Sequence, residues 1–299
     1  MTENQMDMNR AVRFAVNSTK ELEKLDALIG MEDYKTTMRQ IVAAQKRMII
    51  ARSKGRTLRA PSFHMCFLGN PGTGKTSAGH KTAELLYRAG IVNSEKLTVV
   101  GRSDLVAEYV GQTAVKTKKL LKEAAGGVLL IDEAYALMDD RGGSFGDEAI
   151  NTLVEEMDTC RDNLVIIFAG YPDRMKQFLA NNPGLQSRIP YTVHFRDYST
   201  DQLFSIAESF AEEDGYYFHP DVRDTLISIF NTAKKDPEFG NARYVRNLVE
   251  KAEAIKSDRI DILDIVKLSE DELFQLMPED FASIVTVKDL VAEKKIGFF

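Results

Sequence analysis

The chain has 299 residues, of which 44% are hydrophobic and 28% are charged, so it can bury a full core and fits one large domain with a smaller one. Its net charge of -6 gives no general reason to expect nucleic acid as a partner. Two cysteines are too few for a disulfide framework, and no apolar run approaches membrane-spanning length, so membrane insertion is not expected. The N-terminal residues lack the features of a secretory leader, and the expected location is cytoplasmic.

Residues 1–24 are polar and weakly patterned, which predicts an arm or a short helix that needs a partner surface. The stretch Leu28-Ile29-Gly30-Met31 then marks a turn ahead of an amphipathic helix of about twenty residues. Apolar side chains recur in that helix at helical spacing, at positions 38, 41, 42, 48 and 49.

The stretch from Gly69 to Thr76, GNPGTGKT, fits the phosphate-binding pattern G-x-x-x-x-G-K-[ST] between a predicted strand, 63–68, and a predicted helix, 75–87. Its glycines let the backbone wrap around an anion, so that N–H groups and the helix N-terminus point at a β-phosphate. Lysine at the seventh position reaches the β and γ oxygens, and the hydroxyl that follows can ligate Mg²⁺. The residues expected to hold a nucleoside triphosphate are Asn70, Pro71, Gly72, Thr73, Gly74, Lys75 and Thr76.

Beyond this loop, apolar strands alternate with helices as far as residue 196. The predicted strands are 97–100, 127–131, 164–169 and 191–195, and the predicted helices are 114–125 and 145–158. Nearly continuous apolar strands separated by helices indicate a parallel sheet covered on both faces. From Ser199, which with Gln202 makes a capping box, only helices are predicted. We therefore expect an α/β nucleotide-binding domain over 25–196 and a small helical domain over 197–299.

The strand 127–131 ends in two carboxylates, Asp132 and Glu133. Because the chain turns there, both acids can approach a ligand at the carboxyl edge of the sheet. Asp132 would hold Mg²⁺ through its water shell, and Glu133 would orient or deprotonate an attacking water. An acid pair that merely caps a helix is the alternative. Two acids favour hydrolysis over phosphoryl transfer to a small molecule.

These motifs resemble an AAA+ ATPase, and six shorter segments resemble the CbxX/CfxQ family in particular. The segments are Leu28–Met31, Tyr109–Thr113, Gly127–Tyr135, Ala169–Asp173, Asn182–Arg188 and Gly240–Arg243. The family includes red-type Rubisco activases, a sporulation protein and ATPases of type VII secretion. The resemblance spans residues 25 to 260. It implies ATP and Mg²⁺ as cofactors, a parallel five-stranded sheet in the order 5-1-4-3-2, and a C-terminal helical lid.

The resemblance also implies a homohexamer with a central pore. Tyr109, Val110 and Gly111 would form a pore loop that grips an extended polypeptide, ahead of a helix capped by Thr113. From the residues alone, Tyr109 could instead pack against its own domain. The stretch 138–146 would be a second pore-facing loop or an idle flexible turn.

Two arginines match family positions at the nucleotide. Arg188 would be the arginine finger that reaches the γ-phosphate of an adjacent subunit, with a surface salt bridge as the alternative. Asn241 is a predicted N-cap, which puts Arg243 in a first helical turn, where a cation is disfavoured unless an anion is near. The resemblance makes Arg243 the lid arginine, sensor 2, and brings Ile29 and Gly30 to the nucleotide.

The end of the fourth strand departs from the wider AAA+ pattern. An Asn, Ser or Thr usually stands there and helps position the water, whereas this chain has Ala169-Gly170-Tyr171. CbxX/CfxQ members are similar at this point, so hydrolysis is still expected. The group that performs the sensor 1 role is left open.

The sequence therefore predicts a hexameric ATPase that remodels a protein client, with red-type Rubisco as the candidate client and a sugar bisphosphate as a candidate effector. Sporulation and secretion clients stay open. Other classes are a nucleic-acid motor, a nucleotide-switch scaffold and, least favoured, a small-molecule kinase. The C-terminal Ile296-Gly297-Phe298-Phe299 is predicted to dock on its own lid or on a neighbouring subunit.

Overall fold

The computed structural model describes residues 20–56, 58, 61–109, 111–138, 145–160, 163–259, 268–282 and 284. Their contacts divide the chain into two compact units. The first runs to Arg196 without Pro71–Thr73, and the second contains those three residues and the chain from Asp197 onward. Four predicted features lie outside the described residues: most of the N-terminal arm, Val110, most of the 138–146 loop and the Ile296–Phe299 tail.

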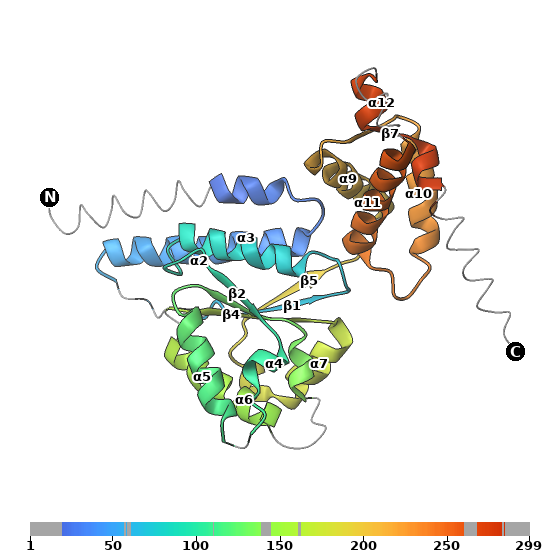
Figure 1. Ribbon diagram of the computed structural model, residues 1–299. Coiled ribbons are helices and arrows are strands. Elements are labelled where there is room, and N and C mark those ends of the chain that lie inside the picture. Colours follow the sequence, from blue (N-terminus) through green and yellow to red (C-terminus); the bar gives the residue numbers. More distant parts are fainter. Residues whose placement is uncertain are drawn as a thin grey trace, which may run out of the picture. The chain divides into compact units, whose positions relative to one another are not determined.

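A five-stranded parallel sheet organises the first unit (Figure 1). Its strands are β1 (Met65–Gly69), β2 (Leu97–Val100), β3 (Val128–Ile131), β4 (Val165–Gly170) and β5 (Tyr191–Phe195). They pair in the order β2-β3-β4-β1-β5, every pairing being parallel, which confirms the predicted order. Every residue of β3 and β4 is buried, as expected of central strands covered on both faces.

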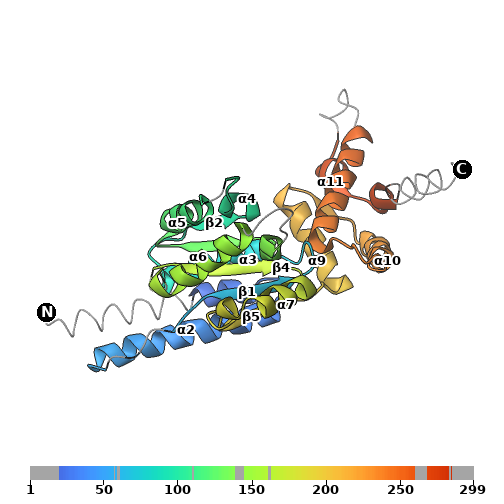
Figure 2. The ribbon, with the colours of Figure 1, turned by 90° about the horizontal axis from the view of Figure 1, so that it is seen from below.

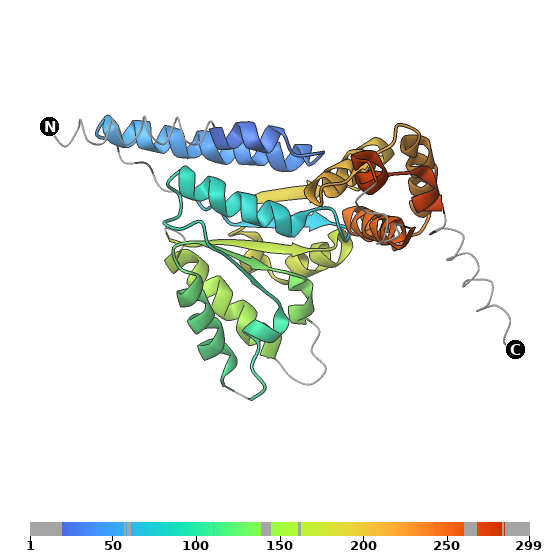
Figure 3. The same cartoon turned by 45° about the horizontal axis from the view of Figure 1, so that its top comes forward.

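Helices cover both faces of this sheet (Figures 1 and 2). On one face lie α2 (Glu32–Ser53) and α3 (Lys75–Arg88), drawn in blue and teal in Figure 3. On the other lie α5 (Thr113–Ala124), α6 (Phe145–Cys160) and α7 (Pro172–Asn181). Each set buries its apolar stripe in its own core cluster. The unit also contains the short elements α4 (Arg102–Leu105), the 3₁₀ turn η1 (Ala134–Met138) and α8 (Pro183–Gln186), and residues 20–26 are helical.

The second unit consists mainly of helices. They include α9 (Thr200–Glu213), α10 (Val222–Ala233), α11 (Asn241–Arg259) and α12 (Glu270–Phe274). The capping box of Ser199 and Gln202 at the start of α9 is confirmed. The expectation of helices alone is wrong, because β6 (Tyr217–Phe218) and β7 (Gln275–Leu276) pair in parallel. Two-residue strands are too short to produce a readable alternation. None of the described helices is long and apolar enough to cross a membrane.

A buried histidine next to β1 joins β4 to α6. His64, just before β1, is 2% exposed. Its Nδ1 accepts a hydrogen bond from the Ile166 N–H at 3.0 Å, and its Nε2 lies 3.3 Å from the carbonyl oxygen of Met157. The first bond requires an unprotonated Nδ1, so the ring is neutral and Nε2–H donates to Met157. Burial lowers the pKa of His64 to about 4, from an ordinary value of 6.5.

This depressed pKa predicts acid sensitivity. The unfolded chain binds a proton at His64 more tightly than the folded chain does. The neutral, buried His64 therefore stabilises the folded state fully above pH 6.5, and this stabilisation is lost as the pH falls toward 4. The contribution of His64 to that loss is about 3 kcal/mol. Urea unfolding of wild type and His64→Gln between pH 7 and pH 4 measures it. The variant should show a shallower pH dependence, and His80→Gln, on the exposed face of α3, should match wild type. Equal slopes for wild type and His64→Gln would contradict the assignment.

Candidate functional site

The phosphate loop joins the end of β1 to the start of α3. Gly74, the residue before α3, has φ 89, and Gly72 has φ 68, both in the left-handed region that glycine reaches without strain. No side chain caps α3, so its first N–H groups can bind an anion. Thr76, in the first turn of α3, is exposed. The loop thus has the backbone shape and the uncapped helix that phosphate binding needs.

Lys75 lies across the start of this loop. Its Nζ donates to the carbonyl oxygens of Gly69 and Asn70 at 2.7 and 2.9 Å. Both acceptors are neutral carbonyls, and a charged phosphate oxygen is a stronger partner for an ammonium group. The ammonium group therefore lies beside the loop, where phosphate oxygens could replace the two carbonyl oxygens as its acceptors.

The acid pair follows β3 directly. The carboxylate of Asp132 accepts the Glu133 N–H at 3.0 Å. Glu133 has φ 48, an uncommon conformation for a residue other than glycine, and its side chain is exposed. This left-handed turn ends the strict alternation of strand faces at Glu133. Both carboxylates thus follow the carboxyl end of β3, as the sequence predicted.

Sheet order places β4 between β1 and β3. The phosphate loop and the acid pair therefore flank the end of β4, where Tyr171 follows the last strand residue. Crevices at the carboxyl ends of parallel strands are the usual ligand sites of open α/β sheets. This arrangement brings together residues that are far apart in the sequence.

Two tyrosines and an arginine gather at this point, and sequence reasoning did not connect them. The rings of Tyr135 and Tyr171 stack with centroids 5.7 Å apart and an interplanar angle of 26°. The guanidinium of Arg174 lies 5.1 Å from the centroid of Tyr135 and 5.9 Å from that of Tyr171. Nζ of Lys75 lies 5.9 Å from the Tyr171 centroid. The available signal was a tyrosine shortly after each of two strands that end at the same edge.

Arg188 follows α8, and its guanidinium is bonded to groups of the same chain. Its Nη2 and Nε donate to the carboxylate of Asp158 at 2.5 and 2.9 Å, and its Nη1 donates to the Gly184 carbonyl oxygen at 3.0 Å. The side chains of Arg188 and Asp158 are 30% and 59% exposed. An ion pair this exposed contributes on the order of 0–1 kcal/mol, so Arg188 can leave it at little cost.

In the second unit, Arg243 is exposed in the first turn of α11, as predicted. The prediction that Asn241 caps this helix is wrong. Asn241 is the first residue of α11, and its Oδ1 accepts the Tyr198 N–H at 3.1 Å while its Nδ2 donates to the Asp197 carboxylate at 2.8 Å. The amide is fully buried, so it satisfies polar groups of the segment before α9 rather than those of its own helix.

The same unit contains a close backbone approach at Gly72. The Ala242 N–H donates to the Gly72 carbonyl oxygen at 3.1 Å. A Cβ on Gly72 would lie 1.9 Å from the Gly240 carbonyl oxygen. Only glycine fits at this position of the loop.

Near the start of the described chain, the candidate nucleotide residues Ile29 and Gly30 are partly exposed in the turn before α2, where Gly30 has φ 64.

Tyr109 projects from the segment between α4 and α5 and is 67% exposed. The two ends of this segment are tied together, because the Ala107 N–H donates to Thr113 Oγ1 at 3.2 Å and Lys116 Nζ donates to the Val106 carbonyl oxygen at 2.9 Å. Thr113 was predicted to cap α5, which is wrong, since its hydroxyl bonds the preceding loop. The segment is therefore anchored at its base, with an exposed aromatic near its tip.

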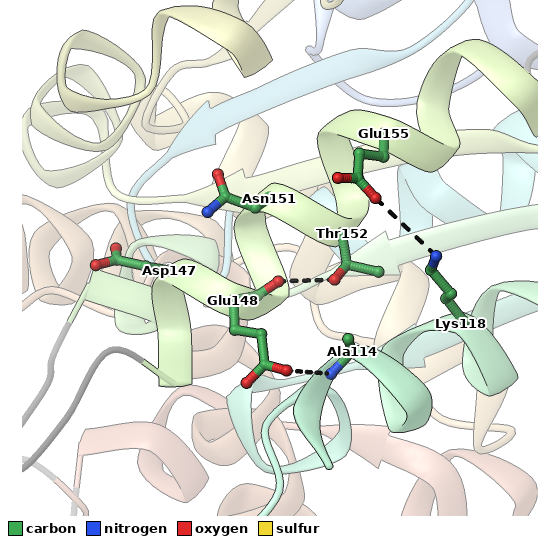
Figure 4. Close-up of a pocket in the computed structure, with 7 residues that line it drawn as sticks. All are labelled: Ala114, Lys118, Asp147, Glu148, Asn151, Thr152 and Glu155. Atoms are coloured by element: carbon green, nitrogen blue, oxygen red, sulfur yellow. Dashed lines mark hydrogen bonds and ion pairs between the residues drawn. The ribbon is translucent and has the colours of Figure 1, made fainter. Parts of the chain in front are cut away.

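The cap of α5 comes instead from α6. Glu148 Oε1 accepts the Ala114 N–H at 3.2 Å, across a pocket of about 360 Å³ between the two helices (Figure 4). A carboxylate at a helix N-terminus both satisfies an otherwise unbonded N–H and complements the helix dipole. Lys118 of α5 and Glu155 of α6 also line this pocket, and they form an exposed ion pair at 4.0 Å. Glu148 therefore connects α6 to the start of α5, the helix that follows Tyr109.

Comparison with known proteins adds the following findings. A family model described as "ATPase family associated with various cellular activities (AAA)" matches residues 65–192, and one described as "AAA lid domain" matches residues 199–289. The Protein CfxQ homolog of Cyanidium caldarium is 39% identical over 278 residues, which cover 92% of this chain and 97% of that protein. Protein CbbX of Cereibacter sphaeroides is 40% identical over 280 residues, covering 92% and 90%.

A chloroplastic ribulose bisphosphate carboxylase/oxygenase activase of Cyanidioschyzon merolae is 39% identical over 279 residues, covering 92% of this chain and 95% of that protein. Among solved structures, the FIGL-1 AAA domain in complex with ADP superposes with a TM-score of 0.59 at 19% identity, covering 87% of this chain and 82% of that one. At this identity the likeness shows the fold alone.

The inter-helix cap predicts a specific loss of stability. Glu148→Gln should lower the free energy of unfolding by about 0.3–1 kcal/mol, the usual value of a charge at a helix terminus, because a neutral amide complements the dipole less well than a carboxylate. Glu155→Gln is the matched control, since it removes a carboxylate of the same helix that makes only an exposed ion pair. Urea unfolding compares the two variants. An equal loss in both would mean that Glu148 contributes only surface charge.

Proposed function

Because the chain belongs to the CbxX/CfxQ family of AAA ATPases, we propose that it uses ATP hydrolysis to remodel a protein client, and that a red-type Rubisco is that client. The observation that carries the remodelling proposal is Tyr109, a large aromatic that is 67% exposed on a segment anchored at both ends. A relative named as a Rubisco activase, similar over nearly its whole length, supports the choice of client.

The phosphate loop, the start of α3 and the acid pair fit a triphosphate with Mg²⁺. The uncapped start of α3 and the Lys75 ammonium suit phosphate oxygens. Thr76 would ligate the cation, and Asp132 would hold it through water, because oxygen donors suit a hard ion. The backbone of Asn70 to Gly74 would cradle the phosphates. The family resemblance alone adds Ile29 and Gly30 to the nucleotide site.

Catalysis would use Glu133 and the two arginines. The exposed Glu133 carboxylate would orient the attacking water and accept its proton. Arg188 would leave Asp158 and bind the γ-phosphate of the ATP held by an adjacent subunit. The proposal therefore includes an oligomer, which we expect to be a hexamer. Arg243 would supply a further cation to the phosphates. Bound ATP supplies the phosphoanhydride bond whose hydrolysis drives the cycle.

Removing the aromatic at the tip of the anchored segment should separate hydrolysis from client remodelling. Tyr109→Ala should hydrolyse ATP at nearly the wild-type rate but fail to release an inhibited red-type Rubisco, because nothing grips the client. Val115→Ala is the matched control, since Val115 is 68% exposed on the neighbouring helix. The assays are phosphate release, with and without ribulose bisphosphate, and recovery of carboxylase activity.

Three outcomes separate the possibilities for this client. Release by wild type and by Val115→Ala, but not by Tyr109→Ala, supports a Rubisco activase. Release that persists in Tyr109→Ala contradicts the gripping role. Hydrolysis by wild type without any release contradicts Rubisco as the client and directs the search to sporulation or secretion clients.

The role of Arg188 in an adjacent subunit has its own test. Arg188→Ala should lower ATP hydrolysis by about 10³- to 10⁵-fold, the range for arginine fingers. Glu133→Gln should also be inactive, because its amide cannot accept the proton. Mixed oligomers of the two variants should regain activity, since some sites then combine Glu133 of one subunit with Arg188 of the next.

Asp158→Asn is the control for the ion pair, and it should retain hydrolysis. If mixing restores nothing while each variant still assembles, Arg188 does not act across subunits. Normal hydrolysis by Arg188→Ala would reduce Arg188 to a surface ion pair.

A further inference from the structure

The last residue of β4 has no room for a side chain. A Cβ on Gly170 would lie 2.8 Å from Cγ of Met175 and 2.9 Å from Cδ1 of Tyr135. The preceding residue, Ala169, is fully buried and apolar. The strand that in most AAA+ proteins ends in a polar side chain therefore ends here without one. The ring of Tyr135 fills the space beside Gly170.

Tyr135 in turn supports Tyr171. Tyr135 is 4% exposed and lies in η1, two residues after the acid pair, while Tyr171 is the residue between β4 and α7. Their rings stack at 5.7 Å, and Arg174 covers both. Burial raises the pKa of Tyr135 to about 12, so its hydroxyl is neutral at physiological pH. The pair is thus a packed aromatic surface at the edge of the sheet.

This surface lies beside the lysine of the phosphate loop. Because β4 lies between β1 and β3, Tyr171 follows the strand that separates the loop from the acid pair. Lys75 Nζ lies 5.9 Å from the Tyr171 centroid, within the roughly 6 Å over which an aromatic face attracts a cation. Tyr171 is therefore placed to act on Lys75.

We propose that Tyr171, supported by Tyr135 and Arg174, is a positioning residue that holds the Lys75 ammonium at the nucleotide phosphates, in place of the polar side chain missing from the end of β4. The inference rests on the proposed role of Lys75 in binding ATP. A carboxylate in this position would neutralise the ammonium and compete with phosphate for its N–H groups. An aromatic face attracts the cation through its quadrupole and leaves all three N–H donors for oxygen acceptors.

The test compares three variants by the kcat and KM of ATP hydrolysis and by the Tm of the protein without nucleotide. Tyr171→Met keeps the bulk of the side chain without an aromatic face, and Tyr171→Phe removes only the hydroxyl. Tyr87→Met is the matched control, because Tyr87 also carries a cation, Arg88 at 5.5 Å, on the same helix as Lys75. Tyr87 lies about 18 Å further along that helix.

Tyr171→Met should lower kcat/KM by roughly 3- to 30-fold, the change expected from losing one cation–π interaction, with its Tm close to that of wild type. Tyr171→Phe should recover most of that loss. Tyr87→Met should match wild type in kcat/KM. An equal loss in the Phe and Met variants would assign the role to the hydroxyl and overturn the proposal. No loss in Tyr171→Met, or failure of both Tyr171 variants to fold, would overturn it as well.

A Lys75→Ala arm separates this inference from the proposed function. Nucleotide affinity, measured with a fluorescent ATP analogue, should fall in Lys75→Ala, and adding Tyr171→Met should cause no further loss, because Tyr171 acts through Lys75. Normal affinity in Lys75→Ala would overturn both the proposed nucleotide site and this inference. Reduced affinity in Lys75→Ala with additive loss in the double variant would overturn this inference alone.

Discussion

The candidate site depends on the position of β4 between β1 and β3. Parallel pairing brings the carboxyl ends of these three strands to one edge, so the phosphate loop, Tyr171 and the acid pair follow adjacent strands. The central strands are buried on every residue, and their ends are consequently held in place by the core. The buried core can therefore hold the lysine of the phosphate loop and the acid pair at the same edge of the sheet.

Three cations of the first unit are held by contacts of modest strength. Lys75 bonds two neutral carbonyl oxygens, Arg174 lies over two rings, and Arg188 pairs with an exposed carboxylate. Each contact orients its cation, and none is so strong that a phosphate oxygen could not replace or join it. Under the proposed function, such contacts would let these cations be positioned before the nucleotide arrives and change partners during the cycle.

The segment that presents Tyr109 combines exposure with anchorage. Its base is tied by Thr113 and Lys116, and the helix that follows is capped by Glu148 of α6. Force applied to an exposed side chain would pass through these bonds to helices whose inner faces belong to the core. A local side-chain cap on α5 would provide no such connection.

The phosphate loop, the acid pair, the apolar strands and the capping box at Ser199 were readable from the sequence, because each is a local pattern imposed by backbone geometry or by a bound anion. Tertiary structure alone decided which groups meet: Tyr135 with Tyr171, Glu148 with the start of α5, Arg188 with Asp158, and buried Asn241 with Tyr198 rather than with its own helix. The parallel pairing of β6 and β7 is of the same kind, since two residues carry no periodicity. In each case the partners are distant along the chain, and their contact depends on how the sheet and helices pack, which no short stretch of sequence records.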